Sequence, residues 1–188
     1  MRRTIGNMKS TKGKDKIAVL TAYDYSTAKA LDESGVDIIL VGDSLGNVVL
    51  GYESTKQVTM EDILRHTGAV SRGAKDCLIV SDMPFESDKS MVLAVKNAKL
   101  LLKAGAHAVK VEGKPEIVKA LVKEDILVMG HVGLLPQTAD QFKVHGKDEK
   151  SAFKILNEAV ELEEAGCFAI VLECVSADLA RKITETVK

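Results

Sequence analysis

Residues 33–42 read Glu-Ser-Gly-Val-Asp-Ile-Ile-Leu-Val-Gly, and this short stretch decides the fold. A polar segment and a glycine are followed by a run of mostly branched apolar residues. Glycine is favoured where a helix ends because it adopts the left-handed backbone there, and a short branched apolar run is typical of a buried strand. The stretch therefore predicts a helix that ends near Gly35, followed by a strand of a parallel sheet.

Three further copies of this helix-glycine-strand pattern occur along the chain. Their glycines are Gly73, Gly105 and Gly166, and an apolar run follows each one. With two more apolar runs, the expected strands are Ile17–Ala22, Asp37–Val41, Cys77–Ser81, Ala108–Val111, Ile126–Met129 and Ala169–Leu172. The expected helices begin at Met60 behind a Thr59 cap, at Met91 after Asp88, at Pro115, at Ala152 and at Ser176.

Alternating strands and helices of this kind predict an α/β protein. Six βα units fit either an open doubly wound sheet or a (β/α)8 barrel from which two units are missing. A full barrel typically needs about 250 residues, and this chain has 188. Because no linker divides the chain, we expect residues 1–188 to form a single domain, incomplete at its C-terminus, with a basic segment at 1–16.

Composition narrows the classes of partner. The chain carries 26 Lys and Arg against 27 Asp and Glu, a net charge of −1, which disfavours nucleic acid as the main partner. Its apolar runs are far shorter than the roughly 20 residues of a membrane span, and the start lacks the apolar core of a secretory signal. We therefore expect a cytoplasmic protein without a membrane partner, in which Cys77, Cys167 and Cys174 are buried thiols.

Ionisable side chains stand at the carboxyl ends of the expected strands, where parallel α/β folds collect their chemistry. Five of the six strands finish in such a group. These residues are Asp43, Asp82, Lys110 with Glu112, His131 and Glu173. A polar residue after a strand often only begins a loop, but the recurrence at five strands favours a common functional site.

Asp43 and Asp82 are the expected metal ligands of this set. Mg2+ prefers oxygen ligands and commonly uses one or two carboxylates while keeping several waters. The alternative is that each aspartate caps the turn that follows its strand. Zinc is disfavoured because no second Cys or His stands at a ligand-like spacing from His131 or Cys174.

Glu173 is the expected general base, because partial desolvation at the end of an apolar strand should raise the pKa of its carboxyl. The remaining histidines, His66, His107 and His145, are expected to be solvated rather than catalytic.

Six motifs lie in the order and spacing of one known family. They are Leu20-Thr21-Ala22-Tyr23-Asp24, Val41 to Gly46, Asp82-Met83-Pro84-Phe85, Val109 to Gly113, Gly130 to Leu134 with Pro136-Gln137, and Leu172 to Val175. These stretches resemble ketopantoate hydroxymethyltransferase. One difference is Glu86-Ser87-Asp88 after Phe85, where the family more usually has Gly-Ser-Tyr.

The resemblance implies a (β/α)8 TIM-type barrel, with about six of eight units in this chain. It also implies transfer of a hydroxymethyl group from 5,10-methylenetetrahydrofolate to 3-methyl-2-oxobutanoate, giving 2-dehydropantoate for pantothenate and coenzyme A synthesis. Matched by position with the family, the Mg2+ ligands would be Asp43, Asp82 and Glu112. Glu173 would be the general base. The residues that bind the 2-oxoacid would be Asp43, Ser44, Asp82, Lys110 and His131. Mg2+ would stabilise the enolate.

Two alternatives compete with this interpretation. One is another Mg2+-dependent carbon-carbon lyase or aldolase that acts on a 2-oxoacid, and the other is an inactive fragment or assembly subunit. The chain stops within its sixth helix, so we expect the outer strands to expose apolar residues such as Ile17, Val19, Ile170 and Leu172. Such edges favour association, and we expect a homo-oligomer.

Overall fold

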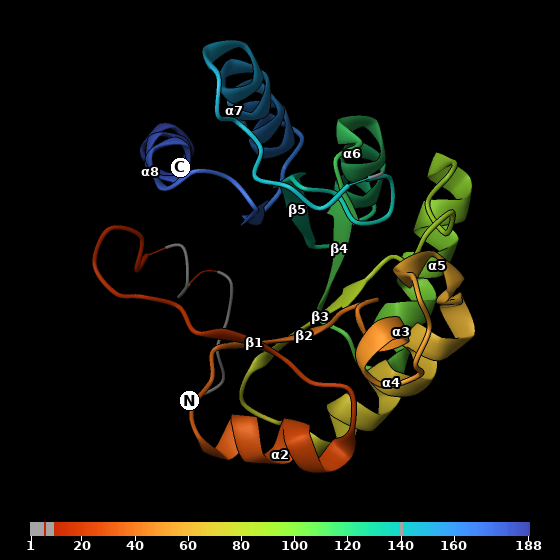
Figure 1. Ribbon diagram of the computed structural model, residues 1–188. Helices are drawn as coiled ribbons and strands as arrows, with labels where there is room; N and C mark the ends of the chain where they lie inside the picture. The colour runs from red at the N-terminus through yellow and green to blue at the C-terminus, as the bar shows by residue number, and fades with distance from the viewer. Residues whose placement is uncertain (1–5, 7–9, 140) are drawn as a thin grey trace. The chain divides into compact units, whose positions relative to one another are not determined.

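Six strands alternate with helices in the computed structural model, which describes residues 6, 10–139 and 141–188 (Figure 1). The strands are β1 Val19–Thr21, β2 Ile38–Val41, β3 Leu78–Asp82, β4 Ala108–Glu112, β5 Val128–Gly133 and β6 Ala169–Glu173, in that order in the sheet. The helices are α2 Tyr25–Glu33, α3 Leu45–Val48, the 3-10 turn η1 Thr55–Gln57, α4 Met60–Gly73, α5 Met91–Ala104, α6 Pro115–Lys123, α7 Glu149–Glu164 and α8 Ala177–Thr186. The α/β class is confirmed; of the basic segment 1–16, residues 1–5 and 7–9 lie outside the described part.

The chain divides into two compact units, residues 1–109 and 110–188. In the first unit, β1 pairs with β2 and β2 with β3, all in parallel, with Leu20 opposite Ile39 and Ile39 opposite Ile79. Helices α2, α4 and α5 pack beside one another on one side of these strands (Figure 1). Ile39 and Ile79 are buried between strands and helices, which fixes the register.

Local signals place the helices of the first unit. Thr59 caps α4 as predicted, and its hydroxyl accepts from the Asp62 N–H while the Asp62 carboxylate accepts from the Thr59 N–H. Helix α5 is capped by Ser90. Gly73 is required for close packing, because a Cβ there would lie 2.4 Å from the Tyr25 carbonyl oxygen of α2.

In the second unit, β5 pairs in parallel with β6, and Gly133 lies opposite Glu173. Strand β5 extends four residues beyond the predicted end at Met129, to Gly133. The reason is close packing: a Cβ at Gly130 would lie 3.0 Å from the Cys167 sulfur, so the glycine admits neighbouring side chains instead of ending the strand. Gly166 adopts the left-handed backbone that the sequence pattern predicts.

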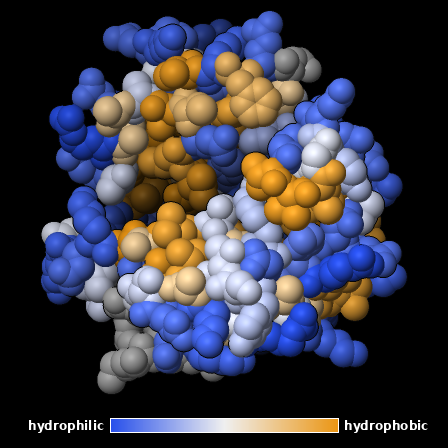
Figure 2. Space-filling view, turned by 60° about the horizontal axis from the view of Figure 1, so that its bottom comes forward, coloured by the Kyte–Doolittle hydropathy of each residue, from blue (hydrophilic) through white to orange (hydrophobic). Residues whose placement is uncertain are grey.

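Apolar side chains reach the surface in both units (Figure 2). Ile17 and Val19 are 39% and 45% exposed, as expected for the first strand. The residues of β6, including Ile170 and Leu172, are half-buried. Strand β1 therefore leaves part of its apolar surface in water, whereas β3 and β4 are buried throughout.

Two of the three cysteines are buried, as expected, and the third is not. Burial raises the pKa of the Cys77 and Cys167 thiols to about 12. Cys174 is exposed, so its expected place in the core is wrong. It lies just beyond β6 with a positive φ of 49°, where the chain turns out of the strand. Among the described residues, every helix is too short or too polar to cross a membrane.

Candidate active site

The first unit brings Asp43 and Asp82 together at the ends of β2 and β3. Both residues are buried, at 5% and 3% exposed. The Asp43 backbone N–H donates to Oδ2 of Asp82 at 2.9 Å. Gly42 makes this approach possible, because a Cβ there would lie 3.4 Å from Oδ2 of Asp82 and 2.9 Å from the Ser44 hydroxyl oxygen. Asp82 thus caps the turn after β2, whereas the alternative for this pair had each aspartate cap the turn after its own strand.

A hydroxyl group stands beside the pair. Ser44 follows Asp43, and its Oγ lies 2.8 Å from the hydroxyl oxygen of Tyr23. The Tyr23 carbonyl oxygen lies 2.5 Å from Nδ1 of His66 in α4. Sequence reasoning did not select Tyr23, although it follows β1, the one strand to which no polar end residue was assigned. Applied to β1, the same strand-end rule would have found it.

The donor set of the first unit suits Mg2+. Two buried carboxylates on neighbouring strand ends offer hard oxygen ligands, and Mg2+ takes one or two such groups with waters completing its shell. Within the described residues, no group of three or more His, Cys, Asp or Glu side chains gathers as it would around a metal ion. Glu112 belongs to the second unit, and its part in metal binding stays a prediction.

The second unit brings Glu112, His131 and Glu173 together from β4, β5 and β6. His131 is 2% exposed. Its Nδ1 lies 3.8 Å from a Glu112 oxygen and its Nε2 lies 3.2 Å from a Glu173 oxygen. The other Glu112 oxygen accepts from the backbone N–H of Gln137 at 3.2 Å. A buried imidazole therefore lies between two carboxylates, and the backbone N–H of Gln137 holds the first of them.

The Glu173 carboxylate differs from the expectation in its pKa. Its hydrogen-bonding contact with His131 lowers the pKa, partial burial works against that effect, and the charges of His131 and Lys110 lower it further. The expected rise is therefore wrong, because desolvation at a strand end is outweighed by the neighbours on β4 and β5. The Glu173 side chain is 36% exposed, so its carboxylate is accessible from outside the protein.

Lys110 is buried on β4, two residues before Glu112. All five residues of this strand are buried, so the face that carries Lys110 and Glu112 is covered, as is the opposite face with Val109 and Val111. A buried ammonium group is a strong partner for an anionic substrate.

The three other histidines have structural contacts that the sequence did not predict. His66 contacts the Tyr23 carbonyl, and His107 accepts from the Ile79 N–H at 2.9 Å. His145 pairs with Val175 as an isolated bridge, and its N–H donates to the Cys174 carbonyl. All three are half-buried, so they are only partly solvated.

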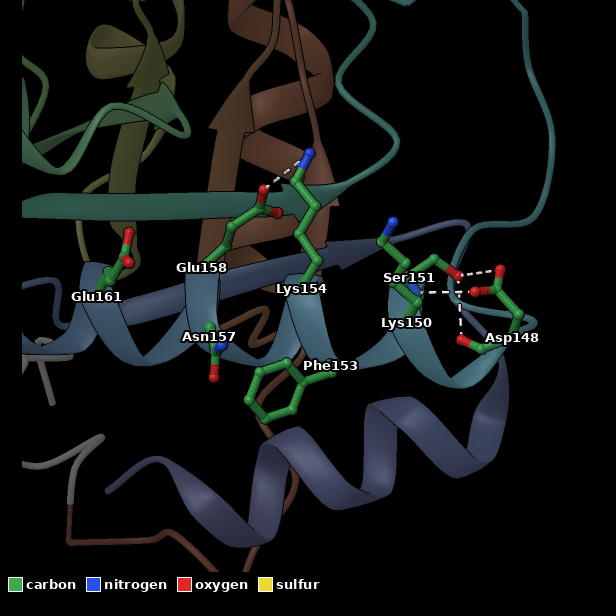
Figure 3. Close-up of a pocket in the computed structure, with 8 residues that line it drawn as sticks. All are labelled: Asp148, Lys150, Ser151, Phe153, Lys154, Asn157, Glu158 and Glu161. Carbon is green, nitrogen blue, oxygen red and sulfur yellow. Dashed lines mark hydrogen bonds and ion pairs between the residues drawn. The ribbon is translucent and has the colours of Figure 1, made fainter.

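A groove lies along α7 (Figure 3). Ser151 donates to Asp148, and Lys154 pairs with Glu158 at 3.7 Å. The lining residues come from one helix and its cap, and several of their charges are satisfied locally. The groove adds nothing to the strand-end chemistry.

Comparison with known proteins decides the family. The sequence profile of ketopantoate hydroxymethyltransferase matches residues 2–188. The chain belongs to this family. A 3-methyl-2-oxobutanoate hydroxymethyltransferase of Clostridium novyi is 54% identical over 196 aligned positions, which cover all of this chain and 71% of that protein. The enzyme of the same name from Ignicoccus hospitalis is also 54% identical, over 96% of this chain and 71% of that protein.

Solved structures show the same fold in more distant proteins. A 2,3-dimethylmalate lyase of the PEP mutase/isocitrate lyase superfamily matches with a TM-score of 0.72 at 15% identity, over 99% of this chain and 67% of that one. A phosphonopyruvate hydrolase matches with a TM-score of 0.75 at 14% identity, over 99% and 68%. At these identities the likeness establishes the α/β fold of the ketopantoate hydroxymethyltransferase chain, and its chemistry must be argued from the residues.

Proposed function

We propose that this protein transfers a hydroxymethyl group from 5,10-methylenetetrahydrofolate to 3-methyl-2-oxobutanoate and forms 2-dehydropantoate. The contact between Glu173 and His131 carries the proposal, because it supplies an ionised base that a buried imidazole holds in place. Membership of the ketopantoate hydroxymethyltransferase family supports the choice of substrates. The alternative, a lyase of similar fold, has support from fold likeness only.

Glu173 takes the proton from the carbon next to the ketone. A base must be ionised to do so, and the lowered pKa keeps the carboxylate ionised across the neutral range. His131 contacts this carboxylate from β5 and orients it. Water hydrolyses 5,10-methylenetetrahydrofolate to formaldehyde and tetrahydrofolate, which leaves. The electron pair left on the substrate carbon then forms the new bond to the carbonyl carbon of formaldehyde, whose oxygen takes up a proton and becomes the new hydroxyl.

Asp43 and Asp82 would hold Mg2+, and we assign Glu112 to the same ion. When bound, Mg2+ acts as a Lewis acid that lowers the cost of enolate formation. The hydrogen bond from the Asp43 N–H fixes the Asp82 carboxylate before any ion arrives. Such fixed ligands reduce the reorganisation that binding would otherwise require.

Lys110 and Ser44 would bind the carboxylate of the 2-oxoacid. Lys110 is buried, so its charge acts in a poorly screened environment, and Ser44 offers a hydroxyl that can donate. His131 would also line the substrate pocket.

Proton exchange tests this function. The protein is incubated with Mg2+ and 3-methyl-2-oxobutanoate in deuterium oxide, and NMR follows loss of the C3 proton signal. We expect fast exchange in the wild type, a loss of at least about a hundredfold in Glu173→Gln, and normal exchange in Glu164→Gln, whose side chain is exposed at the end of α7. Wild-type exchange in Glu173→Gln would rule out the base. Exchange without formation of 2-dehydropantoate from methylenetetrahydrofolate would overturn the transferase assignment.

A further inference from the structure

Tyr23 makes a contact that the proposed chemistry does not yet use. Its hydroxyl oxygen lies 2.8 Å from Oγ of Ser44. Both side chains are half-buried, and they come from the ends of neighbouring strands, β1 and β2. A hydroxyl pair at this distance is a full hydrogen bond, so each group limits the rotation of the other.

The Tyr23 backbone is held on its other side by His66. Nδ1 of His66 lies 2.5 Å from the Tyr23 carbonyl oxygen. A carbonyl oxygen can only accept, so this ring nitrogen carries the proton. His66 lies on α4, whose N-terminus is fixed by the reciprocal bonds of Thr59 and Asp62. Tyr23 is therefore tied to a rigid helix through its backbone.

The next residue adds a third restraint. The Asp24 carboxylate accepts from the Thr27 N–H and hydroxyl, at 2.9 and 2.7 Å, and so caps α2. The chain is thus fixed immediately after Tyr23. Since its backbone is restrained on two sides, the phenol hydroxyl has few positions available and can act as a fixed reference for Ser44.

We propose that Tyr23 is a positioning residue that orients the Ser44 hydroxyl toward the carboxylate of the 2-oxoacid. The inference rests on the proposed role of Ser44 as a substrate ligand. When the phenol donates to Oγ of Ser44, the serine proton must point elsewhere and is available to an anionic acceptor. An unrestrained serine would lose rotational freedom on binding the acid, whereas the restrained one has already lost it.

The test compares Tyr23→Phe with Tyr25→Phe in the full-length chain. Tyr25 is two residues away and 48% exposed, so it is a matched control. Calorimetry measures binding of 3-methyl-2-oxobutanoate in the presence of Mg2+, and kinetics measure KM and kcat. Loss of one neutral hydrogen bond predicts binding weaker by about three- to tenfold in Tyr23→Phe, with KM rising equally. We expect kcat to change by less than about twofold and Tyr25→Phe to bind normally, because the hydroxyl acts on binding.

A double-variant cycle separates this inference from the role of Ser44. If Tyr23 acts through Ser44, then Tyr23→Phe in a Ser44→Ala background has no further effect on binding. Additive losses would overturn the inference, as would normal binding in Tyr23→Phe when Ser44→Ala binds weakly. Normal binding in Ser44→Ala would instead remove Ser44 from the proposed site. A lower melting temperature with unchanged affinity would show that the Tyr23 hydroxyl is only structural.

Discussion

The backbone N–H of Asp43 donates a hydrogen bond to Oδ2 of Asp82 at 2.9 Å. The two residues are 39 positions apart, and the bond joins the ends of neighbouring strands β2 and β3. The bond fixes the direction of the Asp82 carboxylate through the backbone of Asp43. Main-chain geometry therefore fixes one carboxylate of the proposed Mg2+ site relative to the other residue of the pair.

This relationship predicts how two conservative variants affect metal binding. Asp82→Asn keeps an oxygen that can accept from the Asp43 N–H but removes the negative charge, and Asp43→Asn removes the other charge. We expect each variant to weaken Mg2+ binding at least about tenfold. Loss of a residue that only hydrogen-bonds to a metal ligand commonly weakens metal binding by that factor, and loss of the ligand itself should weaken it at least as much. Calorimetric titration with Mg2+ measures the effect. Asp76→Asn, at an exposed position, is the control, and unchanged affinity in both test variants would exclude the pair as ligands.

Gly42→Ala should impair binding more than folding. A Cβ at Gly42 would lie 2.9 Å from the Ser44 hydroxyl oxygen, and that side chain can rotate away at little cost. At Gly73 the obstacle is the Tyr25 carbonyl oxygen at 2.4 Å, which cannot move without the backbone of α2. We expect Gly73→Ala to lower the free energy of unfolding by about 1–3 kcal/mol and Gly42→Ala by less than about 1 kcal/mol.

Only Gly42→Ala should weaken binding of 3-methyl-2-oxobutanoate, because the displaced Ser44 loses its contact with Tyr23. Urea unfolding and calorimetry together measure both quantities. Equal losses of stability in the two variants would contradict the argument.

The sequence predicted these helix boundaries well because their signals are local. Thr59 before an amphipathic run and Gly166 before an apolar run each carry their own backbone preference, and both lie where the pattern placed them. Asp43 and Asp82 could be paired because consecutive parallel strands end at the same edge. These inferences need no knowledge of which side chains meet across the fold.

Contacts between distant residues could not be predicted in the same way. The pKa of Glu173 depends on His131 and Lys110, which reach it from other strands, and one residue's environment does not reveal such neighbours. Gly130 reads as a strand breaker until the Cys167 side chain that fills its place is known. Tyr23 was missed because the contact that suggests a role for its hydroxyl is with Ser44, which is 21 positions away in the sequence.

The pH dependence of proton exchange should report the Glu173 environment. Its pKa lies below the ordinary value of 4.5, mainly through the contact with His131, so the base loses its charge only at more acid pH. The acid limb of the exchange rate should therefore lie below pH 4.5 in the wild type. In His131→Gln the main lowering contact is lost while burial remains, so the limb should move to higher pH.

NMR exchange rates from pH 3 to 8 locate the acid limb in the wild type and in the variant. His145→Gln is the control, because its backbone contacts Cys174 while its ring is not among the groups that lower the Glu173 pKa. An acid limb that stays in place in His131→Gln would show that His131 does not hold the carboxylate. A circular dichroism melt confirms that the variant is folded.

Asp32 should stabilise the first unit through three backbone donors. Its carboxylate accepts from the N–H groups of Lys75, Asp76 and Cys77 at 2.8 to 3.0 Å and so ties α2 to the loop before β3. Burial alone would raise the pKa of Asp32, but these donors outweigh it and lower the pKa. We expect Asp32→Asn to lower the free energy of unfolding by about 1–2 kcal/mol at neutral pH.

The sign of the pH effect follows from the lowered pKa. The stabilisation is complete above the ordinary value of 3.8 and is lost as the pH falls through the folded value. The difference between wild type and Asp32→Asn should therefore shrink in acid, which denaturant unfolding at several pH values measures. Asp76→Asn changes an exposed side chain and should leave stability nearly unchanged. A difference that grows in acid would refute the assigned cause.

Glu86→Gly should stabilise the protein. Glu86 is an exposed residue with φ of 63°, in the loop after β3 where the family more usually has glycine. A left-handed backbone costs an L-residue about 1–2 kcal/mol, and glycine removes that cost while adding about 0.5–1 kcal/mol of unfolded-chain entropy. We expect a net gain of up to about 1.5 kcal/mol in the free energy of unfolding. Glu161→Gly, at an exposed position inside α7, is the matched control and should lose about 1 kcal/mol because its backbone is helical. Thermal and urea unfolding measure the change in the free energy of unfolding of both variants. If the backbone conformation decides the outcome, that change is positive in Glu86→Gly and negative in Glu161→Gly. A loss of stability in Glu86→Gly equal to that in Glu161→Gly would show that the Glu86 side chain contributes more than its backbone strain costs.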